Sequence, residues 1–217
     1  MILQEKDTIC AISTPAGVGG VAIVRVSGPD AISIADSVLS MSKPLAEKKA
    51  NTVSFGRLVK KDEILDEVLV SIFRAPHSFT GEDVVEIAVH GSVFIQREAI
   101  KLLLAAGCRM ADHGEFTKRA FMNGKMDLSQ AEAVADVIAS RSAAAHKVAV
   151  SQMRGGFSRK LQTLRVQLLQ FTSLIELELD FADHEELEFA DRQQLFDLAH
   201  EIDTTISQLV SSFKTGN

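Results

Sequence analysis

Residues that interrupt regular secondary structure are concentrated in the first part of this chain. All four prolines lie at or before Pro76, and ten of the thirteen glycines lie at or before Gly124. Proline and glycine mark turns between short elements, whereas stretches without them permit long helices. We therefore expect an α+β domain over residues 1–118, with a mixed sheet of about five or six strands and two or three helices. An all-α region of long helices should follow over residues 119–217.

Hydrophobic periodicity places the elements of the first part. Short β-branched runs bounded by turn residues predict strands, and apolar residues three and four apart predict helices. One helix should open at Pro29-Asp30, and another should stop at Gly107, a residue type favoured just after a helix end. Strands are expected at Thr8–Ser13, Gly20–Ser27, Thr52–Val59, Glu63–Phe73, Asp83–His90 and Cys108–Ala111, with a hairpin around Lys60-Lys61-Asp62.

The second part has the pattern of packed helices. Ser129 followed by Glu132 predicts a capping box at the start of a helix. The Gly155-Gly156 pair should kink or interrupt a helix, and the acidic stretch Asp180–Asp191 should form a solvated turn. Two apolar seams with nearly 3-4 spacing comprise Leu161, Leu164, Leu168, Phe171 and Ile175, and then Leu195, Leu198, Ile202, Ile206, Leu209 and Phe213.

Composition narrows the class of protein. The chain is 46% hydrophobic and 24% charged, with no apolar run near membrane-spanning length and no signal-peptide pattern in its first residues, so we expect a cytoplasmic protein without membrane contact. Cys10 and Cys108 lack metal-ligand spacing, and we interpret them as buried or half-buried thiols of a reducing cytosol. The net charge of −6 means that any RNA contact must be local or be supplied by another part or partner.

Two glycine-bearing segments are candidate ligand loops. Lys118, Arg119 and Lys125 form a basic segment before the capped helix, which could hold an anion or be a solvated connection. Thr14–Gly20 could let the backbone approach a ligand, although a tight turn is the more common role of such a segment. The histidines are scattered, so no metal site is expected.

Two charged residues stand inside otherwise apolar strands. Arg25 should share a strand face with Ile23 and Ser27, and a solvated face is the favoured interpretation. Glu86 shares its face with Val84 and other small or aliphatic residues, which raises the cost of an unpaired carboxylate. A partner with two parallel N–H donors, such as a guanidinium or a heterocycle, would offset that cost.

Nucleotide-binding motifs are absent from the chain. A phosphate loop requires G-x-x-x-x-G-K-[ST], but the pair Gly124-Lys125 is followed by Met126, and neither D-x-x-G nor N-K-x-D occurs. We therefore expect no catalytic residue in this chain and no GTP binding or hydrolysis by it.

Three sequence blocks carry a family resemblance. GEFTKRAFMNGKMDLSQAEAVADVI, TPAGVGGVAIVRVSGP and SFTGEDVVEIAVHG resemble, in order and spacing, the MnmE/TrmE family of tRNA-modification GTPases. The resemblance implies a domain that binds a reduced folate, 5-formyl- or 5,10-methylene-tetrahydrofolate, as one-carbon donor and that forms a homodimer. The family's folate contacts fall on Arg25, Glu86 and Lys125. Glu86 would read the pterin ring, and the two cations would meet carboxylates or polar groups of the cofactor. The family usually has arginine where Val18 stands, which leaves the role of that turn open.

The resemblance also implies a role for the longer protein. Members act with an FAD-containing partner, MnmG, and add an aminomethyl-type group (carboxymethylaminomethyl) at C5 of the wobble uridine of tRNA. GTP, Mg²⁺ and K⁺ belong to a GTPase domain that would follow this chain. Two alternatives remain: a stand-alone folate-dependent aminomethyltransferase-like enzyme, and a dimerisation or interaction module without a small-molecule site.

Overall fold

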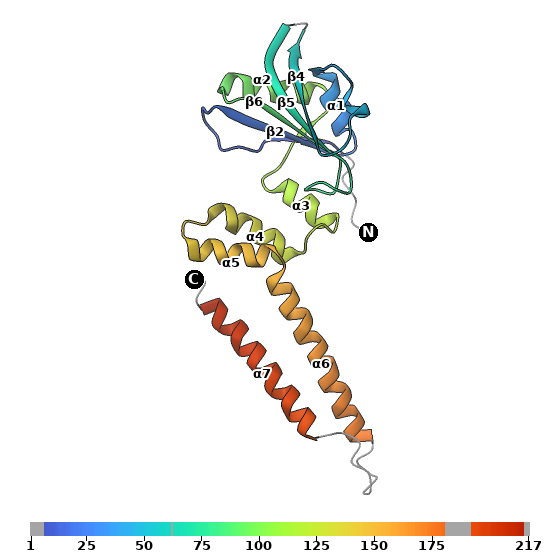
Figure 1. The fold of residues 1–217 in the computed structure, drawn as a ribbon, viewed down its shortest axis with the longest axis vertical. Helices are drawn as coiled ribbons and strands as arrows, with labels where there is room; N and C mark the ends of the chain where they lie inside the picture. Colours follow the sequence, from blue (N-terminus) through green and yellow to red (C-terminus); the bar gives the residue numbers. More distant parts are fainter. Residues whose placement is uncertain (1–6, 62, 181–191, 215–217) are drawn as a thin grey trace. The chain divides into compact units, whose positions relative to one another are not determined.

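The computed structural model describes residues 7–61, 63–180 and 192–214 (Figure 1). The chain divides into two compact units between Met126 and Asp127. The boundary expected at residues 118/119 falls inside helix α3 (Glu115–Met122). All of α3 belongs to the first unit because the Arg119 side chain hydrogen-bonds to Asp7 and Glu82 of that unit.

A seven-stranded mixed sheet forms the first unit, in the order β3-β4-β5-β6-β2-β1-β7. The strands are β1 (Ile9–Ile12), β2 (Val21–Ser27), β3 (Leu39–Ser40), β4 (Thr52–Lys60), β5 (Glu63–Phe73), β6 (Val84–His90) and β7 (Arg109–Met110). Neighbouring strands pair antiparallel, with the exception of β1 and β7, which pair parallel. The expected fold class is confirmed. The short strand expected at Cys108–Ala111 is β7, and the number of strands exceeds the expectation by β3, which has only two residues and lies at the other end of the sheet.

The core of this unit lies on one face of the sheet. Alternation along β2 buries Ala22, Val24 and Val26 and directs the intervening side chains to the other face. Helices α1 (Ala31–Ser37) and α2 (Val93–Ala105) both contact β2 and β6 (Figure 1), and their buried apolar residues belong to the same cluster. Each fully buried aliphatic side chain contributes about 1.5–3 kcal/mol to folding.

Within the described residues, the second unit consists of four helices: α4 (Leu128–Ala139), α5 (Ala143–Met153), α6 (Gly156–Asp180) and α7 (Arg192–Lys214). Successive helices contact each other, and α5 and α6 are separated at Gly155, whose φ is +74°. The expected interruption at Gly155-Gly156 is confirmed. Leu198, Ile202 and Leu209 of the second predicted seam are buried. Residues 181–191 of the expected acidic turn lie outside the described residues.

The start of α4 corrects the expected capping box. The N-cap is Asp127, whose Oδ1 accepts from the Gln130 N–H at 2.9 Å, while the Gln130 side chain accepts from the Asp127 N–H. Ser129 instead lies within the first turn and accepts a hydrogen bond from the Gln152 side chain. The expectation involving Ser129 and Glu132 was wrong because Asp127, two residues earlier, already supplies an equally good cap.

Candidate functional site

An ion pair links the centres of two neighbouring strands. Arg25 of β2 stands directly opposite Glu86 of β6 in the antiparallel register. The Glu86 Oε1 atom accepts from Arg25 Nε at 2.8 Å and lies 2.7 Å from Nη2. The two side chains are 24% and 23% exposed, so the pair is half-buried on the sheet face that α1 and α2 do not cover. Arg25 therefore does not extend freely into solvent as the favoured interpretation held.

Two aromatic rings flank this guanidinium. Phe79, from the segment between β5 and β6, and Phe116 of α3 each have their ring centroid 5.4 Å from the Arg25 Cζ atom. Cation–π contacts of this kind contribute about 0.5–1 kcal/mol each where solvent is near. Sequence reasoning missed both rings, although each is an aromatic residue inside one of the family blocks. The Arg25 Nη1 atom makes no hydrogen bond with the described residues.

Lys125 joins this region through the segment between β5 and β6. Its Nζ donates to the Pro76 carbonyl at 2.9 Å. Gly81 has φ +79°, and a Cβ there would lie 3.2 Å from the Lys125 Cγ and 3.1 Å from the Asn123 Cβ. The same segment thus carries Phe79 to Arg25 and forms the surface on which the Lys125 stem lies. The structure brings Arg25 and Glu86 into direct contact, and Lys125 contacts the segment next to them.

The basic segment before α4 is largely helical, contrary to the loop expected from the sequence. Arg119 lies within α3 and is buried. Its Nη2 atom lies 2.6 Å from Asp7 Oδ1 and 3.0 Å from Glu115 Oε1, and Nη1 lies 3.2 Å from Glu82 Oε1. Because its charge is compensated inside the fold, Arg119 holds α3 in place and is not an exposed anion ligand.

Glu115 is the centre of this buried network. Its Oε1 lies 2.6 Å from Arg109 Nη2, and its Oε2 accepts from the Asp112 N–H at 2.7 Å. Burial by itself would raise the pKa of the Glu115 carboxyl, but hydrogen bonds from Arg109, the Asp112 N–H and Arg119 outweigh it and lower the pKa to about 2. The network fixes the start of α3, and thereby the position of Phe116 beside Arg25.

The glycine-rich turn before β2 packs closely on the segment after β6. The Gly19 N–H donates to the Gly91 carbonyl at 3.1 Å, and Gln96 of α2 donates to the Gly17 carbonyl. A Cβ at Gly91 would lie 2.3 Å from the Gly19 oxygen, so only glycine fits there. Val18 at the tip of the turn is 86% exposed.

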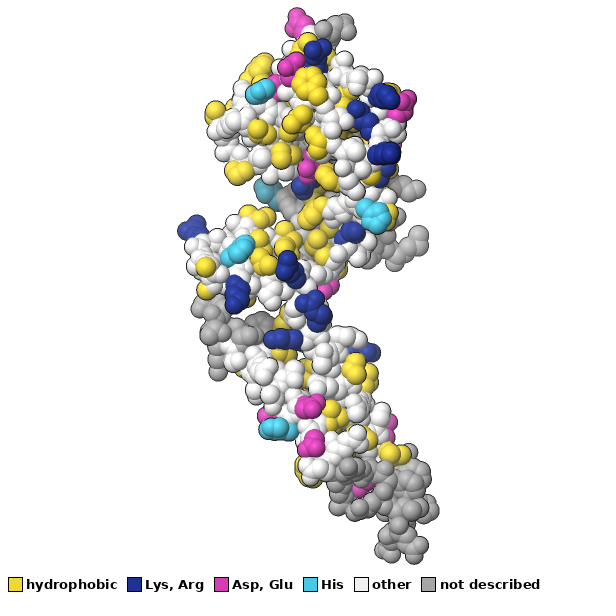
Figure 2. Space-filling model, viewed as in Figure 1, with side chains coloured by type: hydrophobic (Ala, Val, Ile, Leu, Met, Phe, Trp, Pro, Cys, Tyr) yellow, Lys and Arg dark blue, Asp and Glu magenta, His cyan; other side chains and the backbone are white. Residues whose placement is uncertain are grey.

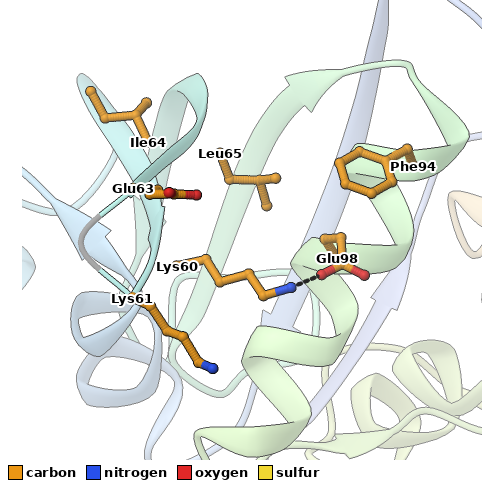
Figure 3. A pocket seen from close by; sticks show the side chains of 7 residues that line it. All are labelled: Lys60, Lys61, Glu63, Ile64, Leu65, Phe94 and Glu98. Carbon is orange, nitrogen blue, oxygen red and sulfur yellow. Dashed lines mark hydrogen bonds and ion pairs between the residues drawn. The ribbon is translucent and has the colours of Figure 1, made fainter.

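Two surface cavities occur elsewhere in the first unit. The larger, about 620 Å³, lies between the β4–β5 hairpin and α2 (Figure 3), where Glu98 is paired with both Lys60 and Lys101. Its lining residues are Lys60, Lys61, Glu63, Ile64, Leu65, Phe94 and Glu98. The second, about 590 Å³, adjoins Met41 and Gly56. Neither cavity is lined by Arg25, Glu86 or Lys125.

Metal-ligand clusters and membrane-spanning helices are both absent from the described ranges. Over residues 7–61, 63–180 and 192–214, no three or more His, Cys, Asp or Glu side chains gather as metal ligands. In the same part of the chain, no helix is long and apolar enough to cross a membrane.

Two family profiles match this chain, one for each unit. The first covers the α+β unit that carries the ion pair, and the second covers the unit of long helices. The family described as "GTP-binding protein TrmE N-terminus" matches residues 8–125, and "MnmE helical domain" matches residues 128–217. The chain belongs to the MnmE/TrmE family of tRNA modification GTPases, as its sequence blocks predicted.

Curated relatives agree with this assignment. The protein named "tRNA modification GTPase MnmE" of Parabacteroides distasonis is 61% identical over 215 residues, which are 97% of this chain and 47% of that protein. The protein of the same name from Bacteroides thetaiotaomicron is 59% identical over 99% of this chain, and that from Flavobacterium johnsoniae is 53% identical over 98% of this chain. Each match covers 46% of the relative's length. The chain thus spans about half the length of the curated relatives it matches.

Proposed function

We propose that the first unit binds a reduced folate, 5-formyl- or 5,10-methylene-tetrahydrofolate, as a one-carbon donor. The observation that carries this proposal is the half-buried pair of Arg25 and Glu86 between two aromatic rings. The Glu86 Oε2 atom and the Arg25 Nη1 atom make no hydrogen bond with the described residues, so one acceptor and one donor remain available to a ligand.

The ring N–H and amino group of a pterin are two adjacent donors that suit a carboxylate. In the ligand-free pair, Oε1 already accepts both bonds from Arg25, which leaves Oε2 as the acceptor for the pterin. Bidentate recognition would require Arg25 to release Oε1 and turn toward the ligand. Lys125 extends from the neighbouring segment and would meet a carboxylate or polar group of the cofactor.

For the longer protein we propose the role of its relatives. It would act as a homodimer with an MnmG-like FAD protein and add a carboxymethylaminomethyl group at C5 of the wobble uridine of tRNA, in the cytoplasm. Hydrolysis of GTP with Mg²⁺ and K⁺ would reside in the part of the relatives that this chain does not span. The chain itself lacks every GTPase motif and should not bind GTP.

Calorimetric titration with 5-formyl-tetrahydrofolate tests the folate site. Glu86→Ala should weaken binding about tenfold or more, since an unpaired buried polar group costs about 1–3 kcal/mol and 1.4 kcal/mol is one decade. The matched control is Glu67→Ala, which removes the carboxylate of the exposed cross-strand pair of Arg57 and Glu67. It should leave the affinity within about twofold, as expected for exposed pairs.

Two results would contradict the proposal. One is a parent chain that binds no folate, which would favour a dimerisation or interaction module. The other is a folded Glu86→Ala variant that binds as tightly as the parent.

A further inference from the structure

Positive and negative charges are segregated along the second unit. Although 29 of the 217 residues are Asp or Glu, none lies between Asp136 and Glu176. That interval contains six cations: Arg141, Lys147, Arg154, Arg159, Lys160 and Arg165. A chain with a net charge of −6 therefore contains a continuous segment that is purely cationic.

These cations line the surface of α5 and the first half of α6. All six side chains are exposed, and none forms an ion pair with a carboxylate of the described residues. One internal bond is made: Arg159 Nη1 donates to the Arg154 carbonyl at 2.8 Å, which places these two neighbours together. Figure 2 shows dark blue side chains gathered over α5 and the first turns of α6. We define these six residues as the cationic surface.

Three arginines of the first unit are arranged differently. Arg25, Arg109 and Arg119 each contact carboxylates of the first unit. Such pairing compensates their charge inside the fold. Among the described residues no carboxylate compensates the cationic surface in this way, so its positive potential is open to an external polyanion.

We propose that the cationic surface binds the phosphate backbone of RNA, and this inference rests on the proposed role in tRNA modification. Four of the six cations are arginines, whose planar guanidinium matches a phosphate group with two parallel hydrogen bonds. The eleven residues of α5 extend ~16 Å, and α6 extends a further ~15 Å to Arg165, which is room for several successive phosphates. Contacts of this kind position a nucleic acid without reading its sequence.

The composition of α5 argues against an anionic membrane as the ligand. Helices that lie in a membrane interface carry Trp, Phe or Leu opposite their cationic face. The sequence of α5, AAAHKVAVSQM, contains none of these residues, whereas Phe157 and Leu161 stand in the first turns of α6, so vesicle binding is one of the outcomes of the test.

The test measures binding of an in vitro-transcribed tRNA to the full chain between 50 and 200 mM KCl. The variant carries Arg141→Gln, Lys147→Gln, Lys160→Gln and Arg165→Gln. These four side chains make no hydrogen bond with the described residues, so the fold should be retained. A matched control carries Lys43→Gln, Lys49→Gln, Lys61→Gln and Arg97→Gln, four exposed cations of the first unit.

The proposal predicts that the cationic-surface variant loses at least tenfold in affinity at 100 mM KCl. The slope of log K against log salt concentration should become shallower by about three, because each lost phosphate contact removes roughly 0.7 to 0.9. The control variant should keep the slope of the parent to within about one. Circular dichroism and folate titration of the same samples establish that fold and folate site are unchanged.

Each contrary outcome overturns the proposal. A parent chain that binds no tRNA, or two variants that lose affinity equally, would remove the role of this surface. The same holds if phosphatidylserine-containing vesicles, and not tRNA, bind in a manner that depends on the four residues. Folate binding is measured in a separate experiment. If the chain binds tRNA but not folate, the folate proposal is contradicted, whereas the proposal for the cationic surface is not.

Discussion

Neutralising Glu115 should expose how much the buried network contributes to the first unit. Glu115 is 2% exposed, and its carboxyl has a pKa of about 2 in the folded chain against an ordinary value of 4.5. A carboxyl with a lowered folded pKa adds stability above its unfolded pKa and loses it as the pH falls toward the folded pKa. The lowered pKa corresponds to about 3 kcal/mol of stability at pH 7, which is lost progressively as the pH falls below the ordinary value of 4.5.

Glu115→Gln keeps the shape of the side chain and removes the titration. Its unfolding free energy should be lower than that of the parent by about 3 kcal/mol at pH 7, and the two should converge as the pH falls from 5 to 3. Carboxyls with lowered pKa values outside this network, such as Asp127, are present in both proteins and largely cancel in the difference.

Urea unfolding between pH 3 and 7 measures this difference. The chain has no Trp or Tyr, so both proteins would carry Phe94→Trp as a fluorescence reporter at an exposed position of α2. Exposed Glu47 gives the control, and Glu47→Gln should change stability by less than about 0.5 kcal/mol at every pH. A Glu115→Gln difference that stays constant from pH 7 to pH 3 would refute the reasoning, because the loss would then come from packing and not from the carboxylate charge.

Two further substitutions test local geometry. Gly91→Ala should lower the free energy of unfolding, measured by thermal unfolding, by about 1–3 kcal/mol or more, since the new Cβ would overlap the backbone of Gly19. Gly20→Ala is the control, because the space around Gly20 is open, and it should change the free energy of unfolding by no more than about 0.5 kcal/mol. Equal effects of the two substitutions would contradict the close approach of Gly91 and Gly19. Asp127→Ala should cost about 1 kcal/mol in the unfolding of the helical unit followed at 222 nm, and Ser129→Ala should cost less. The reverse order would reinstate the cap expected from the sequence.

Much of the fold follows from local sequence patterns. The hairpin of β4 and β5 and the strands β2 and β6 lie where β-branched runs predicted them. The end of α2 before Gly107, with φ +115°, and the interruption at Gly155 were also predicted. These features could be predicted from the sequence because side-chain periodicity and the conformation of glycine depend only on residues close to each other along the chain.

The candidate site could be predicted only in part from the sequence. Arg25, Glu86 and Lys125 were named from the sequence, and Glu86 was expected to need a partner with two parallel donors. Its partner in the ligand-free chain is Arg25, 61 residues earlier, which no local pattern indicated. Only the antiparallel register of β2 and β6 places these two residues opposite each other.

The sequence by itself determined the two-part organisation, most element positions and the candidate charged residues, because these depend on neighbours along the chain. Tertiary structure alone decided which charges are compensated and which are open to a ligand. Arg119, expected in an exposed loop, is buried among carboxylates. The cations of α5 and α6, by contrast, are exposed and form no ion pair with a carboxylate in the described part of the chain. The physical reason is that compensation of a charge depends on distances of a few ångströms in space, and these are set by packing and strand register.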